Sequence, residues 1–270
     1  MNDLYPSRKN ILLEQIVLVD GQPACGKGAL DPAISSMQRV ELLNFSPQIE
    51  NICGLNYLGR LDDNSAVAML RLEADLVLYE TMMSRNTNFR PNDQSSAFKD
   101  INLFTYIKRL FNKGDSLVPD KIIKEKPILH FMTHAMLGVS KPLFNAFKNK
   151  IIIIELVRHP KSMLSKQTEY NEWWLTDDGK KRQFQLFINY NDNEIPFWAK
   201  EWADLYINGN PVDRAILEMS HQIKISQSFK NQNKTLFDDQ CLTMPFEKFV
   251  IKPWPYLEQV EVLLKTKISN

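Results

Sequence analysis

The segment Gly21-Gln-Pro-Ala-Cys-Gly-Lys27 has the residue types and spacing of a phosphate-binding loop. Two glycines permit a tight turn, whose backbone N–H groups, together with the N-terminus of a following helix, attract phosphate oxygens. Lys27 adds a positive charge. The pattern G-x-x-x-x-G-K is informative between a strand and a helix, and the apolar run 16–20 precedes it directly. The segment predicts a P-loop, against the simpler alternative of an ordinary strand-to-helix turn.

The two residues after Lys27 carry no hydroxyl, because they are Gly28 and Ala29. A P-loop that hydrolyses ATP or transfers its phosphate usually supplies a Ser or Thr hydroxyl to Mg²⁺ at this place. We therefore expect a nucleotide whose chemistry needs no metal, and no metal site. Cys25 lies in the loop at the predicted helix N-terminus, where the pKa of a thiol tends to fall.

The elements that would position this loop alternate between two kinds of pattern. Apolar runs without alternation predict strands that are covered on both faces, at 16–20, 127–132, 150–157 and 240–244. Helical patterns follow at 66–83, 101–111, 161–173, 197–207, 212–229 and 254–264, and a polar, Asn-rich loop is expected at 86–100. This alternation predicts an α/β fold in three layers, a P-loop fold with a central, mostly parallel sheet flanked by helices. We expect a single domain over residues 1–270.

Three further segments make the chain resemble the sulfotransferase family. The first, 128–137 (ILHFMTHAML), is similar to a family strand that ends in K-T-H. The second, 151–165 (IIIIELVRHPKSMLS), is similar to a family strand followed by R-x-P and a helical serine. The third, 242–253 (LTMPFEKFVIKP), is similar to the family's last strand-to-helix segment. The resemblance spans most of the chain. It implies a P-loop α/β fold and the use of 3′-phosphoadenosine-5′-phosphosulfate (PAPS).

The resemblance also implies roles for particular residues. The 5′-phosphosulfate would be held by Gly21, Gln22, Pro23, Ala24, Cys25, Gly26, Lys27 and Gly28. Arg158 and Ser165 would hold the 3′-phosphate, since a guanidinium suits bidentate phosphate binding. Lys27 would stabilise the transition state electrostatically, and His134 would be the general base. His130 and the carboxylate of Asp31 remain alternative bases.

The chain departs from the family pattern in several places. Ala24 stands where one branch has lysine, Met132 precedes the Thr-His pair, and Lys166 occupies the place expected for the serine. The family's C-terminal R-K-G segment is missing, and 179–182 is a candidate substitute as a basic loop, although a solvated charge cluster is the commoner role. Two alternatives therefore stay open: a P-loop kinase, with Glu155 or Asp20 organising Mg²⁺, and a degenerate nucleotide-binding protein without turnover.

Composition limits the partners and the compartment. A formal net charge of +1 gives no global field toward nucleic acid or anionic lipid. Three irregularly spaced cysteines predict free thiols and a cytoplasmic location, and no secretory signal or membrane span is expected. The acceptor would be a small molecule or glycan. Aromatic residues at 170–174 and 197–202 are candidates for an acceptor pocket, although aromatic residues at helical spacing more often form core.

Overall fold

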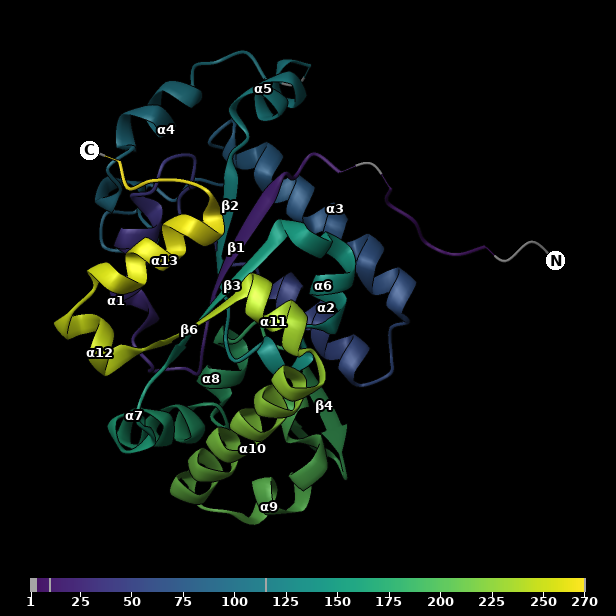
Figure 1. Ribbon diagram of the computed structural model, residues 1–270. Coiled ribbons are helices and arrows are strands. Elements are labelled where there is room, and N and C mark those ends of the chain that lie inside the picture. The colour runs from purple at the N-terminus through teal and green to yellow at the C-terminus, as the bar shows by residue number, and fades with distance from the viewer. Residues whose placement is uncertain (1–3, 10, 115, 270) are drawn as a thin grey trace.

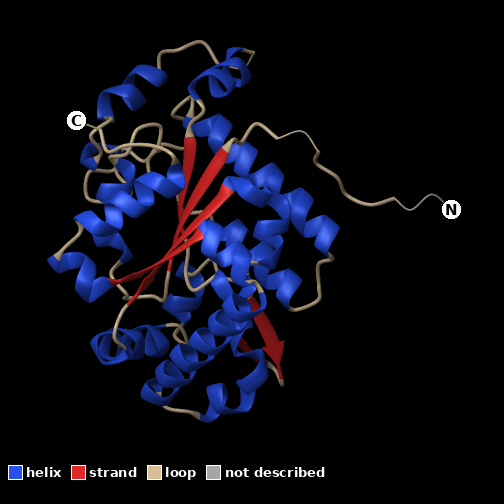
Figure 2. Cartoon of the chain, in the orientation of Figure 1, coloured by secondary structure: helices blue, strands red, loops and turns tan. Residues whose placement is uncertain are grey.

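The computed structural model describes residues 4–9, 11–114 and 116–269, with a four-stranded sheet at its centre (Figure 1). The strands are β1 Gln15–Asp20, β2 Ile128–Met132, β3 Ile151–Val157 and β6 Cys241–Pro245. Their order is β2-β1-β3-β6, and every neighbouring pair is parallel. Helices flank this sheet (Figure 2), so the predicted three-layer α/β fold is confirmed.

The α-helices of the described residues are α1 Lys27–Ser35, α2 Pro47–Tyr57, α3 Asp63–Thr81, α4 Leu103–Arg109, α5 Leu117–Glu125, α6 Lys141–Phe147, α7 Pro160–Trp173, α8 Asp177–Arg182, α9 Ala203–Asn208, α10 Pro211–Gln232, α11 Lys234–Gln240, α12 Phe246–Ile251 and α13 Trp254–Leu264. Short 3₁₀ turns are η1 Ala97–Lys99, η2 Leu137–Val139, η3 Lys148–Lys150 and η4 Phe197–Trp202. None of the helices in the described part of the chain is long and apolar enough to cross a membrane.

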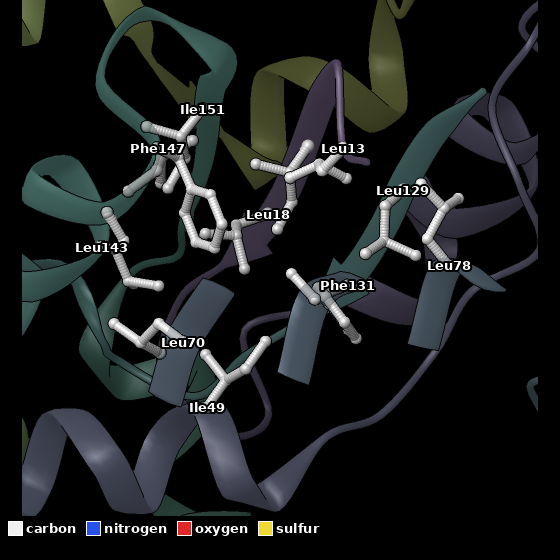
Figure 3. Packing of buried hydrophobic residues seen from close by; sticks show 14 of the residues in the cluster. Leu13, Leu18, Ile49, Leu70, Leu78, Leu129, Phe131, Leu143, Phe147 and Ile151 are labelled. Carbon is white, nitrogen blue, oxygen red and sulfur yellow. The ribbon is translucent and has the colours of Figure 1, made fainter. Parts of the chain in front are cut away.

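Alternate residues of the strands supply the two faces of the sheet. On one face Val17 and Val19 of β1 pack in a cluster with Leu30 of α1 and Val260 of α13. On the other face, the cluster joins strands to α2, α3 and α6 (Figure 3), through Leu18, Phe131, Ile151, Ile49, Leu70 and Leu143. Burial on both faces explains why these strands read as continuous apolar runs.

The carboxyl ends of the four parallel strands lie at one edge of the sheet. The P-loop follows β1, His134 follows β2, Arg158 follows β3 and Phe246 follows β6. Since β1 lies between β2 and β3, the P-loop has a neighbouring chain segment on each side. A crevice outside the carboxyl ends of such a sheet is the usual place for a ligand in an α/β fold.

The region after α7 differs from the prediction. The candidate basic loop 179–182 lies in α8, and an antiparallel hairpin of β4 Phe187–Tyr190 and β5 Asn193–Pro196 follows it. Its turn residues Asn191 and Asp192 have φ of 49° and 62°, the left-handed conformation that Asn and Asp tolerate in tight hairpins. The predicted helix 197–207 is instead η4 followed by α9.

Candidate functional site

The P-loop requires its two glycines. Gly21 has a φ of 146° and Gly26 a φ of 99°, values that side chains rarely adopt. A Cβ on Gly21 would also overlap the carbonyl oxygen of Leu156, and one on Gly26 would overlap the ring of Phe246. The pattern G-x-x-x-x-G therefore reflects both backbone conformation and close packing.

The carbonyl groups of the loop are turned toward donors. The ammonium of Lys27 donates to the oxygens of Gly21 at 2.6 Å and Gln22 at 3.0 Å. The Ala24 oxygen accepts from Nη1 of Arg158 at 3.2 Å. An ammonium has three N–H donors, and the third one of the buried Lys27 meets a weak acceptor, the Cys25 Sγ at 4.0 Å.

The amide groups of the loop have the opposite character. Among the described residues no acceptor is recorded for the backbone N–H groups of Ala24, Gly26 and Gly28. The last of these lies in the first turn of α1, where N–H groups have no partner within the helix. Free amides at a helix N-terminus, with Lys27 beside them, are groups of the kind that attract an anion such as a phosphate.

Arg158 lies beside the loop, as the resemblance implies. Its guanidinium carbon is 4.6 Å from the centre of the Phe246 ring, and its Nε atom is buried with no hydrogen-bond partner in the described structure. It also lines a cavity of about 170 Å³ together with Gly21, Gln22 and Cys25. The structure therefore brings Arg158 to the P-loop with donor capacity to spare.

Ser165 is not brought to this place. It is exposed on α7 and lines none of the cavities that the P-loop lines. The buried face of α7 carries Met163, Gln167 and Asn171, and Gln167 donates to the Pro23 oxygen at 2.8 Å. At about 100° per residue, Ser165 is turned far from that face.

His134 stands at the wall of a larger cavity of about 550 Å³, which the P-loop residues Ala24, Gly26 and Lys27 also line. Glu50 of α2 holds His134, since its Oε1 lies 3.0 Å from the ring Nδ1 and accepts from the backbone N–H at 2.8 Å. A carboxylate at Nδ1 fixes the proton there and leaves Nε2 as the acceptor. The sequence pattern gave no indication of Glu50.

The two alternative bases lie elsewhere. His130 is fully buried, with Nδ1 3.4 Å from the Ser35 hydroxyl, and burial lowers its pKa to about 3. Asp31 faces a different cavity of about 290 Å³ beside Gly28, and burial raises its pKa to about 6. Neither side chain lines the cavity that contains His134.

The carboxylates that a kinase would use are engaged in the fold. Asp20 is buried, and its two oxygens accept from the Thr133 hydroxyl at 2.9 Å and from the amides of Met136 and Leu137, both at 3.0 Å. Glu155 accepts from Lys230 at 2.5 Å and from the Thr243 hydroxyl at 2.8 Å. Asp20 thus ties the end of β1 to the segment that carries His134.

Aromatic side chains also line the large cavity. They are Tyr57, Tyr170, Trp173, Trp174, Phe197 and Trp198. Trp174 and Trp198 are mostly buried, with ring centres 5.8 Å apart. The same rings therefore form a small core and line the cavity, and their role in binding an acceptor stays a prediction.

A polar group that the sequence pattern did not single out also faces this cavity. Glu218 and Gln222 of α10 both line it, although Glu218 is only 1% exposed. Asn171 of α7 donates to Glu218 at 2.8 Å and Gln222 donates at 3.4 Å. Burial raises the pKa of Glu218 to about 8. The signal in the sequence that could have indicated this group was the position of Glu218 on the same helix face as the apolar residues Ala215 and Met219.

The structure also bears on the predictions for Cys25 and for the loop 86–100. The pKa of the Cys25 thiol is raised by burial, with the charge of Lys27 opposing the rise, so the expected fall is wrong. In the loop 86–100, the Gln94 side chain lies where a Cβ on Gly28 would stand. Gly28 thus leaves room for this loop.

A scan against models of protein families and a search of curated proteins each find no match for this chain. The residues of the site are therefore the basis on which its function is inferred.

Proposed function

We propose that this protein is a sulfotransferase that moves a sulfuryl group from PAPS to a hydroxyl or amine of a small-molecule or glycan acceptor. The observation that carries the proposal is the cavity of about 550 Å³, which is lined by P-loop residues, by aromatic side chains and by His134. A transferase must hold its donor and acceptor in contact, and this layout is suited to both. The three free thiols are in keeping with a cytoplasmic enzyme.

The residues around the loop fit a nucleotide that carries phosphate at two positions. The amides of Ala24, Gly26 and Gly28 and the third donor of Lys27 would hold the 5′-phosphosulfate. The buried, unpartnered Nε of Arg158 is available to a second phosphate. PAPS, when bound, supplies a sulfuryl group on a phosphate that becomes the leaving group.

His134 would accept the proton of the acceptor's hydroxyl. Glu50 keeps the ring proton on Nδ1, so Nε2 has the lone pair that a general base needs. The negative charge of Glu50 also stabilises the imidazolium that forms when Nε2 takes up this proton.

The kinase alternative has less support. Gly28 and Ala29 supply no hydroxyl for Mg²⁺, and the oxygens of Asp20 and Glu155 already accept hydrogen bonds. A degenerate protein without turnover would share the fold and the nucleotide site. Turnover therefore separates it from the enzyme.

Calorimetry with adenosine 3′,5′-bisphosphate, compared with ATP and Mg²⁺, tests the nucleotide. We expect the bisphosphate to bind without metal, and Arg158→Ala to weaken it by a factor of about 10 to 100, the loss of one or two charge-assisted hydrogen bonds. The matched control is Arg60→Ala, since Arg60 is exposed in the turn after α2. Binding of ATP alone, and only with Mg²⁺, would refute the proposal.

Turnover of PAPS in the presence of an acceptor panel tests the base. We expect His134→Ala to lower kcat by about two to four orders of magnitude, the usual contribution of a general base, while bisphosphate affinity stays unchanged. Full turnover in His134→Ala would remove His134 from the mechanism. Bisphosphate binding without turnover in the unmodified protein would favour the degenerate alternative.

A further inference from the structure

Glu218 lies at the wall of the large cavity, and none of the described residues forms a recorded ion pair with it. It is buried, and the described groups that act directly on its pKa are the amides of Asn171 and Gln222 rather than a lysine, arginine or histidine. A buried carboxyl group of this kind is costly to ionise unless a positive charge comes to it.

The surrounding side chains have more acceptors than donors. Within the described part of the chain, the side-chain oxygens of Gln167, Asn171 and Gln222 are buried and lack a hydrogen-bond donor. Exchanging the O and N positions of Asn171 would not help, because its oxygen would then face Glu218. Buried polar atoms are normally paired, and the single O–H of a protonated Glu218 serves at most one of these three oxygens, so this cluster is short of donors.

Aromatic rings that line this cavity already face cations of the protein. At the same cavity, Arg182 lies 5.5 Å from the ring centre of Trp173, and Lys166 lies 5.2 Å from that of Tyr170. No cation of the described residues is recorded over the deeper ring of Trp174. Indole is the ring that attracts cations most strongly.

We propose that the cavity binds, beside Glu218 and Gln222, an organic amine in its ammonium form; the ammonium donates to these two side chains and the apolar body lies against Trp174 and Trp198. An ammonium supplies both the missing donors and the missing charge, whereas a neutral alcohol supplies one donor and no charge. As a statement about the acceptor, the inference rests on the proposed function. The binding itself needs no nucleotide.

The test uses two probes of equal length, 4-phenylbutylamine and 4-phenylbutan-1-ol, titrated into the full-length protein by calorimetry and tryptophan fluorescence. We expect the amine to bind at least about tenfold more tightly than the alcohol, the effect of one desolvated charge pair. Glu218→Gln should lower amine affinity by about tenfold and change alcohol affinity less than about twofold. Glu172→Gln, an exposed glutamate on α7, is the matched control and should change neither.

Equal affinity for the two probes, or an unchanged ratio in Glu218→Gln, would overturn the inference. If that variant does not fold, Gln222→Met removes one unpartnered oxygen and leaves Glu218 in place. It too should weaken the amine, and unchanged amine affinity would overturn the inference. Because the titrations contain no nucleotide, bisphosphate binding without amine preference refutes the amine site alone. Amine preference without bisphosphate binding refutes the sulfotransferase proposal alone.

Discussion

Replacing Glu218 by glutamine should alter how stability depends on pH. Burial raises the pKa of Glu218 to about 8 from an ordinary value of 4.5. Between these values the folded protein holds a proton that the unfolded chain releases, so the free energy of unfolding falls as pH rises. At 1.36 kcal/mol for each pKa unit, the full difference is at most about 5 kcal/mol.

Glu218→Gln has no titrating group at this position and keeps an amide that accepts from Asn171. Between about pH 4.5 and about pH 8, the free energy of unfolding of the unmodified protein should therefore fall by up to about 5 kcal/mol relative to that of the variant. Outside that window the difference between the two proteins should stay constant. Urea unfolding followed by tryptophan fluorescence, at about pH 5 and about pH 9, measures the difference. His130 and Asp31 titrate in both proteins, so their contributions cancel.

The exposed Glu172→Gln is again the control, and its stability difference should not vary with pH. If the difference between the unmodified protein and Glu218→Gln is the same at both pH values, Glu218 is not held neutral by burial. The reasoning from burial to pKa would then be wrong.

Two further substitutions test the packing, each against a matched control. Gly26→Ala should lower the free energy of unfolding by at least about 2 kcal/mol, since φ of 99° is strained for alanine and its Cβ meets Phe246. The control is Gly59→Ala, at φ of 67° in open space, which should cost about 1 kcal/mol. Equal losses in thermal unfolding would show that the ring contact is unimportant. Glu41→Gln should lower the free energy of unfolding by about 3–5 kcal/mol, because it leaves buried Arg109 without its ion pair. The control is Asp63→Asn, which breaks an exposed pair and should cost at most about 1 kcal/mol. Similar losses for the two variants in urea unfolding would contradict the role of burial.

The central sheet could be predicted because burial on both faces leaves a strong pattern. The continuous run 151–156 can only be satisfied in a covered strand, and its observed strand begins and ends within one residue of the expected range. The turn of the P-loop could be predicted for a different reason, because the local backbone conformation requires its two glycines. Short-range physics thus determined both.

The partners of the site could not be predicted in the same way. Glu50 lies on α2, a helix whose buried positions Ile49, Ile52, Cys53 and Gly54 form a weak apolar stripe. Ser165 was inferred from resemblance, and its exposure follows from which face of α7 packs. Which face packs depends on α10 and the P-loop, and is therefore a tertiary property.

The contact between Gly26 and Phe246 joins two parts of the chain that leave the ribosome at very different times. The P-loop is synthesised directly after β1, but the ring that packs on it and lies under Arg158 belongs to the segment after β6, the last strand of the sheet along the chain. During translation, the proposed phosphate site therefore stays incomplete until Phe246 has been made. Products truncated before Phe246 would carry the intact P-loop motif without a finished site.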